Sequence, residues 1–372
     1  MIMPDVQKLL DKIYHSVIPE IEDLESVLSF QDDGQIAQLF NFSDKVRKEF
    51  CGDGVALRGI IEFSNYCSRE CFYCGINKNN HRLRRYRMDE KQILDAVEYL
   101  ASCNIKTVVL QSGEDGILNA LWMKEVIEKI KSRWDIAITL SVGERSADDY
   151  KTWRKAGADR YLLKIETSEE ALYSSMHPGM DFKKRLDCLR ILKELNYQVG
   201  SGNLIGLPAQ SLKMIAQDII FFKRNDFDMI GIGPFIPHQD TRFAGQNKGN
   251  VLLTLKTIAL IRLVTKNAHI PATTALGSMD RDYRLDGLKC GANILMPNFT
   301  PAPYRKFYEI YPQKRCVNEP VGVCNLCMET MAKGLGRFID YSQADSLKSG
   351  KKFKQILNSK PEIPACRQAK QI

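Results

Sequence analysis

Three closely spaced cysteines are the residues of this 372-residue chain whose pattern points most directly to redox chemistry. Cys67, Cys71 and Cys74 lie in the segment C-S-R-E-C-F-Y-C, and Tyr73 precedes the last of them. Three such thiolates on one loop can hold a cubane iron–sulfur cluster and leave its fourth iron without a protein ligand. A small molecule could bind that open iron, as one binds the open position of a catalytic zinc site. A structural zinc site with His81 as the fourth ligand is the alternative.

A second set of cysteines, Cys316, Cys324 and Cys327, lies near the C-terminus with the spacing C-x₇-C-x₂-C. These thiolates could hold an auxiliary iron–sulfur cluster or, with an outside ligand, zinc. The alternative is a set of free cysteines that bind metal only adventitiously. The remaining cysteines show no partner spacing and are expected to pack as small apolar groups: Cys51, Cys103, Cys188, Cys290 and Cys366. A disulfide scaffold does not fit a long chain with an odd count of 11 cysteines.

Alternating apolar runs and amphipathic stretches must position these cysteines. Short, β-branched runs predict parallel strands buried on both faces, at Ala56–Phe63, Thr107–Gln111, Ile136–Val142, Arg160–Lys164, Gln198–Asn203, Asp228–Gly233, Pro271–Ala275 and Asn293–Pro297. Helical patterns lie between them at Lys91–Ser102, Leu121–Lys131, Phe182–Leu195, Leu212–Arg224 and Leu252–Thr265, and Asp89 with Gln92 resembles a capping box. Eight strand–helix units predict an α/β fold, specifically a complete (β/α)₈ TIM-type barrel. A doubly wound open sheet is the structural alternative.

The same pattern divides the chain into three parts. Residues 1–54 form an N-terminal helical segment, residues 55–300 the barrel, and residues 301–372 a C-terminal extension with the second cysteine set. From about Ser342 the extension is Lys-rich and polar, a composition that does not predict order. In such barrels the active site lies at the carboxyl ends of the strands, which is where the unusual residues of this chain occur.

Composition narrows the class of protein. The 44% of apolar and 26% of charged residues are ordinary for a globular enzyme. No apolar stretch is long enough for a membrane span, and the N-terminus lacks a signal-peptide core, so we expect no membrane partner and a cytoplasmic location. The net charge of +8 is mild. The basic run Arg82, Arg84, Arg85 and Arg87 could bind nucleic acid, but its place after the cysteine loop favours covering a cofactor, so we expect no nucleic-acid partner.

The C-x₃-C-x₂-C motif with its aromatic residue resembles that of the radical S-adenosylmethionine (SAM) superfamily. This resemblance implies a [4Fe–4S] cluster that reductively cleaves SAM to methionine and a 5′-deoxyadenosyl radical. Within the superfamily the chain is similar to the biotin-synthase-like branch and to its HydE family of [FeFe]-hydrogenase maturases. The segments that carry this resemblance start at Ile60 (I-I-E-F-S-N-Y-C), Arg84 (R-R-Y-R-M), Val109 (V-L-Q-S-G-E-D), Ala156 (A-G-A-D-R-Y-L-L-K), Phe227 (F-D-M-I-G-I-G-P-F-I-P-H), Ile270 (I-P-A-T-T-A-L-G) and Gly291 (G-A-N-I-L-M-P-N).

The resemblance also implies roles for individual residues. Arg185 matches the arginine that binds the SAM carboxylate, Glu166 the residue that binds the ribose, and Ser112-Gly113-Glu114 the segment that binds the amino group. Further SAM contacts would come from Tyr73, Gln111, Ser141, Pro234 and Met296. No acid–base catalytic residue is expected, because the cofactor carries the hard chemistry. For each of these residues an ordinary strand-end cap or surface charge is the alternative.

Residues expected to face the barrel interior would form the substrate site: Arg58, Thr139, Arg160, Met229, Thr273, Thr274 and Tyr308. A buried arginine is costly unless it meets an anion, so Arg58 and Arg160 predict an anion site at the barrel floor, with a buried Arg–carboxylate pair as the alternative. The HydE resemblance implies an organometallic substrate, iron with cysteine, CO and cyanide ligands. It also implies the maturases HydG and HydF as partners and an electron donor of the ferredoxin or flavodoxin type.

Two departures from the HydE pattern leave more than one substrate compatible with the sequence. Ala209 stands before Gln210 where the family usually has Gly, and the family's Gly-Arg-Glu turn is missing near Asp282–Leu285. The alternative functions are a methylornithine-synthase-like aminomutase that acts on lysine, or a HydE-like paralogue with another small-molecule substrate. A methylornithine-synthase-like enzyme should lack the cysteines of the second set.

Overall fold

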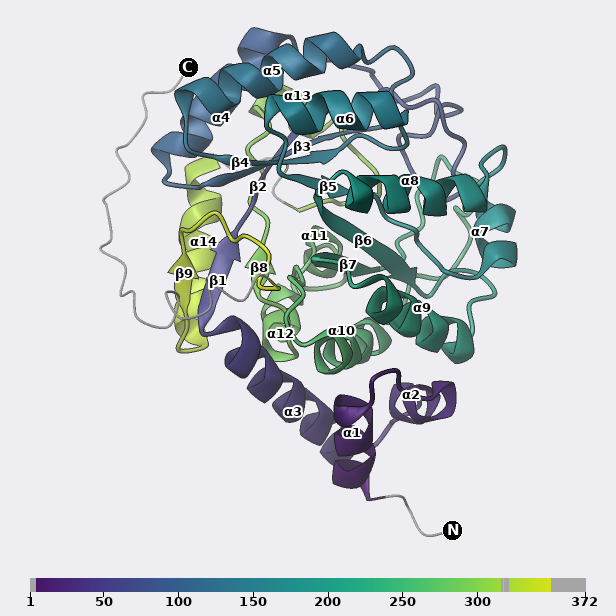
Figure 1. Cartoon of the computed structure of the whole chain (residues 1–372). Coiled ribbons are helices and arrows are strands. Elements are labelled where there is room, and N and C mark those ends of the chain that lie inside the picture. The colour runs from purple at the N-terminus through teal and green to yellow at the C-terminus, as the bar shows by residue number, and fades with distance from the viewer. Residues whose placement is uncertain (1–4, 316, 318–320, 349–372) are drawn as a thin grey trace.

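The computed structural model describes residues 5–315, 317 and 321–348 (Figure 1). Three helices precede the first strand, as the helical spacing predicted: α1 (Val6–His15), α2 (Ile21–Leu28) and α3 (Asp33–Cys51). The carboxylates of Asp5 and Asp32 cap α1 and α3 by accepting from Lys8 N and Gln35 N. The three helices pack on one side of the strand layer, where α3 and α2 contact helices α10 and α9 (Figure 1).

Six parallel strands form the main sheet in the order β2-β3-β4-β5-β6-β7. They are β2 (Gly59–Ser64), β3 (Thr107–Ser112), β4 (Ala137–Ser141), β5 (Arg160–Leu162), β6 (Gln198–Ile205) and β7 (Met229–Pro234). A smaller parallel sheet has the order β8-β1-β9, with β1 (Gly54–Leu57), β8 (Ile294–Leu295) and β9 (Phe338–Asp340). Because all these strands run parallel, their carboxyl ends lie on the same side, and the loops that follow them can share one site.

Helices follow the strands and cover the outer face of the main sheet (Figure 1). They are α4 (Glu90–Ser102), α5 (Ala120–Arg133), α6 (Ala147–Ala156), α7 (Glu170–Met176), α8 (Phe182–Glu194), α9 (Leu212–Asn225) and α10 (Val251–Thr265). Four further helices follow later in the chain: α11 (Thr274–Gly277), α12 (Arg284–Lys289), α13 (Ala302–Arg305) and α14 (Val321–Gly334), which contacts β9 of the smaller sheet. The capping box predicted from Asp89 and Gln92 is confirmed at the start of α4. No described helix is long and apolar enough to cross a membrane.

Two of the predicted strands differ from the structure. The first apolar run splits at Arg58 into β1 and β2, which belong to different sheets. The run Pro271–Ala275 is not a strand: it makes one bridge, from Pro271 to Ile294, and α11 begins at Thr274. Proline has no N–H for a ladder bond, which shortens pairing here.

Isolated parallel bridges connect the two sheets. Met229 of β7 bridges His269, Pro271 bridges Ile294 of β8, and Ile60 of β2 bridges Asn298. The backbone N–H of Arg58 donates to the Leu295 carbonyl (3.0 Å) and so continues the pairing of the smaller sheet toward β2. The predicted α/β fold with parallel strands is therefore confirmed.

Candidate functional site

The first cysteine set lies on the loop between β2 and α4, at the carboxyl end of the main sheet. The three thiols are partly buried. Burial, and next the neighbouring Cys67, raises the pKa of the Cys71 thiol to about 12. Burial also raises the pKa of the Cys74 thiol, with further contributions from Cys71 and Cys67. The thiols therefore lie close enough to interact, and a nearby cationic group would be needed to hold them as thiolates.

The alternative for this loop is a structural zinc site with His81 as the fourth ligand. Among the described residues, no three His, Cys, Asp or Glu side chains are arranged to hold a single metal ion. A zinc ion draws its sulfur ligands to about 2.3 Å from one point, whereas the thiolates of a cubane cluster bind different irons and lie further apart. His81, the expected fourth zinc ligand, is exposed. Within the described residues the structure therefore shows no zinc site at this loop.

Arg85 fixes the shape of the cysteine loop. Its Nη1 donates to the carbonyls of Asn65 (2.6 Å) and Ile76 (2.8 Å), on the two sides of the cysteine set. Its Nη2 donates to the carbonyls of Asn77 (2.6 Å) and Asn80 (3.2 Å). The planar guanidinium thus ties both ends of the loop together through four acceptors. This role of Arg85 was not predicted from the sequence. The position of the basic run directly after the cysteine loop could have indicated it.

The other arginines of the basic run also have partners. Arg87 donates to both carboxylate oxygens of Asp115 (2.5 and 3.0 Å), and Arg82 pairs with Asp240 (3.0 Å). The guanidinium of Arg84 lies over the ring of Phe307. These arginines therefore have partners within the protein, and the expected lack of a nucleic-acid partner stays a prediction.

The Ser112-Gly113-Glu114 segment packs directly on the cysteine loop. Ser68 donates from its N–H and its hydroxyl to the Glu114 carbonyl (2.9 and 3.0 Å), and Gly113 N donates to Ser64 O (3.1 Å). A β-carbon at Gly113 would lie 2.3 Å from the Tyr66 carbonyl oxygen and 2.8 Å from Cys67 Cβ. Only glycine allows this approach, so the segment and the cysteine loop are held in one fixed arrangement.

A network of opposite charges lies beside the loop. Arg69 Nε donates to Glu114 Oε1 (2.5 Å), and Arg69 also pairs with Glu144 (3.4 Å). Arg185, from α8, pairs with Glu144 Oε1 (2.9 Å) and donates to the Tyr173 hydroxyl (3.3 Å). Two carboxylates and two guanidinium groups therefore converge here, a set complementary to a ligand that carries both an amino group and a carboxylate.

Arg69 and Glu144 were not among the sequence-predicted site residues. Glu144 is buried, and its N–H donates to the Glu114 carboxylate (3.0 Å), which links the loop after β4 to the loop after β3. Because Glu144 comes directly after a predicted strand, the sequence could have indicated it as a site residue. Arg69 lies between the first two cysteines of the first set, so its signal was its place inside the motif.

Tyr73 is held by a buried histidine. Its hydroxyl lies 2.9 Å from His177 Nε2, and His177 Nδ1 lies 2.8 Å from the Tyr173 carbonyl. A carbonyl can only accept, so Nδ1 carries the proton and Nε2 accepts from Tyr73. Burial lowers the pKa of His177 to about 3, so this ring stays neutral. The pair fixes the aromatic side chain that precedes Cys74.

Glu166, four residues after the end of β5, has a strained backbone. Its φ of 64° is in the left-handed region, which a residue with a β-carbon rarely adopts. Its carboxylate pairs with Lys164 (2.8 Å), and its N–H donates to the Gly202 carbonyl (2.9 Å). Such strain clusters at functional sites, which agrees with the role that the resemblance implies for Glu166.

The other expected cofactor and substrate residues also lie at strand ends or in the interior. Gln111 donates to the hydroxyl of the buried Tyr308 (3.3 Å), and Thr273 donates to the Ile232 carbonyl (3.2 Å). Ser112, Ser141 and Pro234 are the last residues of β3, β4 and β7, Thr274 begins α11, and Met296 follows β8. The strands thus bring these residues to one end of the fold.

The interior contains an open space beside β7. A β-carbon at the buried Gly231 would meet, among the described residues, no atom closer than the Ser201 carbonyl oxygen at 3.9 Å. Met229, two residues earlier on the same face, accepts from the buried Arg58. Within the described part of the chain, Arg58 Nε and Thr139 Oγ1 are buried without a hydrogen-bond partner. Unpaired buried polar groups in native proteins call for a partner that the chain itself does not supply, such as water or a ligand.

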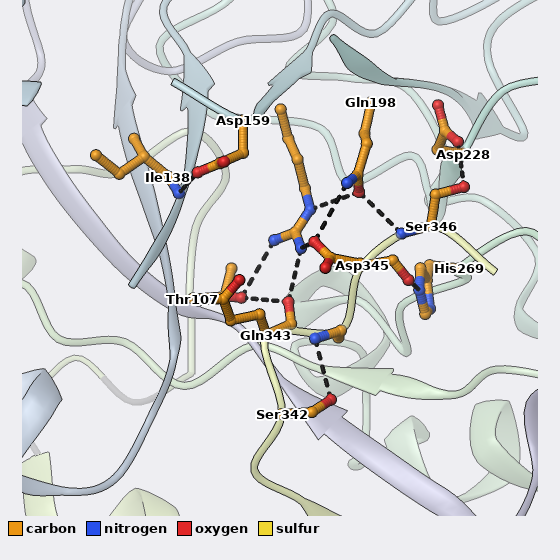
Figure 2. Close-up of polar contacts among 12 residues, drawn as sticks. Thr107, Ile138, Asp159, Gln198, Asp228, His269, Ser342, Gln343, Asp345 and Ser346 are labelled. Atoms are coloured by element: carbon orange, nitrogen blue, oxygen red, sulfur yellow. Dashed lines mark hydrogen bonds and ion pairs between the residues drawn. The ribbon is translucent and has the colours of Figure 1, made fainter. Parts of the chain in front are cut away.

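Arg160 does not share this arrangement. Its guanidinium donates to Gln198 (2.9 Å) and Thr107 (3.2 Å) and, through Nη2, to the Gln343 carbonyl (2.7 Å) and Asp345 (2.9 Å). These contacts fit the alternative of a buried Arg–carboxylate pair and not an anion site open to substrate. The prediction of an anion site at Arg160 did not foresee its pairing with Asp345 (Figure 2). Asp345 is distant in sequence and lies in the polar segment for which composition predicted no order.

The second cysteine set lies largely outside the described residues. Cys316 is not described, nothing is described of the Cys324 side chain, and Cys327 is exposed on α14. The auxiliary cluster therefore stays a prediction.

The two departures from the HydE pattern lie in loops that are held by side-chain hydrogen bonds. Ala209 adopts φ of 65°, the left-handed conformation that glycine favours, and Gln210 still accepts from Gly206 N (2.7 Å). In the second loop, Arg284 donates to both carboxylate oxygens of Asp282 (3.0 and 2.7 Å).

The chain is similar in sequence and in fold to known proteins. The family model "Radical SAM superfamily" matches residues 61–262, more than half of the chain. The [FeFe] hydrogenase maturase subunit HydE of Thermotoga maritima is 44% identical, over 85% of this chain and 90% of that protein. The 3-methylornithine synthase of Methanosarcina acetivorans is 28% identical, over 79% of this chain and 84% of that protein. The crystal structure of methylornithine synthase (PylB) has a TM-score of 0.77 at 25% identity and covers 91% of this chain and 98% of that one. The chain therefore belongs to the radical SAM superfamily and, within it, to the HydE family of maturases.

Proposed function

We propose that the strands form a complete (β/α)₈ barrel, with residues 1–54 and 301–372 as additions to a barrel of residues 55–300. The bridges from β7 to His269, from Pro271 to β8, and from β2 to Asn298 support this closure, since they connect both edges of the main sheet. In this arrangement the segment around Pro271 takes the place of the seventh strand.

Membership of the family implies a [4Fe–4S] cluster and SAM. When bound, they supply a 5′-deoxyadenosyl radical by reductive cleavage of SAM. We propose that Cys67, Cys71 and Cys74 hold the cluster and that Arg85 fixes their loop. Glu114, with the neighbouring Ser112 and Gly113, would bind the amino group of SAM, and Arg185 its carboxylate. The other SAM contacts would come from Tyr73, Gln111, Ser141, Glu166, Pro234 and Met296.

Replacing Arg185 tests its role. Because Arg185 is the buried cation of the network, Arg185→Ala should weaken SAM binding by about 2 kcal/mol, roughly 30-fold, the effect of a lost charged hydrogen bond. Calorimetric titration of the reconstituted protein with SAM would measure this change. Arg190→Ala is the matched control, because this arginine of the same helix is 58% exposed, pairs with Asp187 and Glu194 outside the network, and should leave the affinity unchanged. An Arg185→Ala protein that binds SAM like the wild type would reject the assignment.

We further propose that the enzyme acts in assembly of the [FeFe]-hydrogenase active site on an iron complex with cysteine, CO and cyanide ligands. The observation that carries this proposal is the 44% identity to HydE over 90% of that protein, against 28% to 3-methylornithine synthase. HydG and HydF would be the maturation partners, and a ferredoxin or flavodoxin the electron donor. The space beside Gly231, with Arg58, Thr139, Met229, Thr273, Thr274 and Tyr308 around it, would be the substrate chamber. Cys316, Cys324 and Cys327 would hold an auxiliary cluster.

A reconstitution assay tests this function. The protein would be combined with HydG, HydF, SAM, reductant and hydrogenase lacking its diiron site, and hydrogen evolution would be measured. We expect activation with the wild type. Gly231→Val should keep the cluster and SAM binding but lose activation at least about tenfold, because its methyl groups fill the chamber. No activation by the wild type, together with conversion of lysine to methylornithine, would favour the aminomutase instead.

A further inference from the structure

A buried carboxylate lies next to the turn that carries Glu166. Asp218 belongs to α9, which packs against β6 on the outer face of the main sheet (Figure 1), and it is 0% exposed. Its Oδ1 accepts from the N–H (2.6 Å) and the hydroxyl (2.7 Å) of Ser168, two residues after Glu166. Its Oδ2 accepts from Asn203 Nδ2 (2.9 Å) of β6. Asp218 thus connects the turn, the strand and the helix.

The partners of Asp218 are neutral. Among the described residues they are the donors of Ser168 and Asn203, and no lysine or arginine pairs with this carboxylate. Burial raises the pKa of Asp218 to about 6, although the hydrogen bonds oppose the shift. Because the folded protein disfavours the charged form, the carboxylate lowers the stability of the fold above about pH 6. Carboxyl groups with such shifts and specific partners cluster at functional sites.

The turn at Glu166 has a conformation that a residue with a β-carbon disfavours, since its φ is 64°. Its backbone pairs with β6 on both sides: its N–H donates to the Gly202 carbonyl (2.9 Å), and its carbonyl accepts from Leu204 N (3.1 Å). Asn203, which donates to Asp218, lies between these two residues of β6. The carboxylate of Asp218 therefore holds the turn and its pairing strand together, and this supports the strained backbone.

We propose that Asp218 is a positioning residue for SAM binding and that it acts through Glu166. Its hydrogen bonds to Ser168 and Asn203 keep the turn in the left-handed conformation, and the turn in that conformation directs the Glu166 carboxylate to the ribose of SAM. Without these bonds the turn relaxes in most molecules, and the affinity for the ribose falls with the fraction that stays competent. The inference rests on the proposed SAM site in taking Glu166 as its ribose contact.

The two products of SAM cleavage serve as probes, because methionine lacks the ribose and 5′-deoxyadenosine contains it. Each would be titrated calorimetrically into the reconstituted full-length protein, 5′-deoxyadenosine in the presence of saturating methionine. Asp218→Leu removes the acceptors of all three hydrogen bonds. It should bind 5′-deoxyadenosine about tenfold more weakly, the factor by which an unsupported residue disfavours the left-handed conformation, and methionine like the wild type. A merely structural role would change both affinities or neither.

Asp218→Asn is the conservative variant. Its oxygen still accepts from Ser168, and the amide of Asn203 can turn so that its Oδ1, buried without a partner among the described residues, accepts from the new amide. The affinity for 5′-deoxyadenosine should therefore stay within about threefold of the wild type, the effect of weaker, uncharged hydrogen bonds. Asp226→Asn is the matched control, because this carboxylate at the end of the same helix is 74% exposed and pairs with Lys348. It should change neither affinity.

A double-mutant cycle with Glu166→Ala shows whether Asp218 acts through Glu166. Glu166→Ala alone should weaken the binding of 5′-deoxyadenosine at least about tenfold, the effect of a lost charged hydrogen bond. Adding Asp218→Leu should weaken it by no more than about twofold further, because the contact that Asp218 positions is already absent. Ser168→Ala, which removes the hydroxyl contact alone, provides a second variant if Asp218→Leu does not fold. It should weaken 5′-deoxyadenosine binding about threefold and leave methionine binding unchanged.

The outcomes separate this inference from the proposed function. A Glu166→Ala protein that binds 5′-deoxyadenosine like the wild type would reject the ribose contact and, with it, the role of Asp218. If Glu166→Ala weakens binding but Asp218→Leu or, where that variant does not fold, Ser168→Ala does not, the positioning role is overturned and the SAM site stands. Fully additive losses in the double variant would overturn it as well. No maturation partner enters these titrations, so failure of the hydrogenase assay would leave their result standing.

Discussion

Cys71→Ser should remove both the iron–sulfur cluster and the cleavage of SAM. Each thiol of the first cysteine set would bind one iron, so a hydroxyl in place of the middle one leaves an iron without its ligand. We expect 5′-deoxyadenosine production to fall by more than roughly 100-fold, beyond the loss that follows when an outer-shell partner of a metal site is removed. Anaerobic reconstitution, iron and sulfide analysis, and quantification of 5′-deoxyadenosine with dithionite as reductant would measure it.

Cys103→Ser is the matched control for this experiment. Cys103 is a buried cysteine at the C-terminal end of α4, outside the cysteine loop. This variant should keep its cluster and cleave SAM at the rate of the wild type. Retained cleavage in Cys71→Ser would contradict the cluster assignment, whereas equal losses in the two variants would indicate a general loss of folding.

Gly113→Ala should have the second-largest effect. Its new methyl group would lie 2.3 Å from the Tyr66 carbonyl oxygen and 2.8 Å from Cys67 Cβ, and neither is the far end of a flexible side chain. The cysteine loop or the Glu114 segment must therefore move. A displacement of about 1 Å in an active site can cost roughly 100-fold in rate, so we expect a loss of that order in SAM cleavage.

Gly116→Ala provides the comparison three residues away. A β-carbon at Gly116 meets nothing within 4 Å among the described residues, and the residue is exposed. This substitution should leave cluster content and SAM cleavage unchanged. If Gly113→Ala is as active as Gly116→Ala, the close approach of the two segments has no role in the reaction.

The strands were predictable from sequence where burial alone determines them. The runs that became β3, β4 and β7 are largely apolar, and their bounds differ from the expected ones by one residue. The run that became β6, Q-V-G-S-G-N, is mostly polar or glycine, and the strand extends two residues beyond it. The seventh run was wrong because apolar content does not reveal a missing ladder donor at Pro271 or a helix start at Thr274. β9, with three residues, is too short for a periodic signal.

The site was predictable where local spacing carries the chemistry. Cys67, Cys71 and Cys74 are close in sequence, and the residues after each strand could be expected at one end because parallel strands share a direction. The partner of Arg160 was not predictable. Asp345 lies 185 residues further along the chain, and nothing in the polar composition of residues 342–348 indicates that the strands bind them. Contacts between distant segments depend on the completed fold.

The central claim is that three cysteines hold a cluster with one iron open to SAM. Electron paramagnetic resonance of the dithionite-reduced protein, recorded without and with SAM, tests it most directly. Because SAM would become a ligand of the open iron, we expect the signal of the reduced [4Fe–4S] cluster to change its g values when SAM is added. A signal that is identical in the presence of saturating SAM would contradict the account.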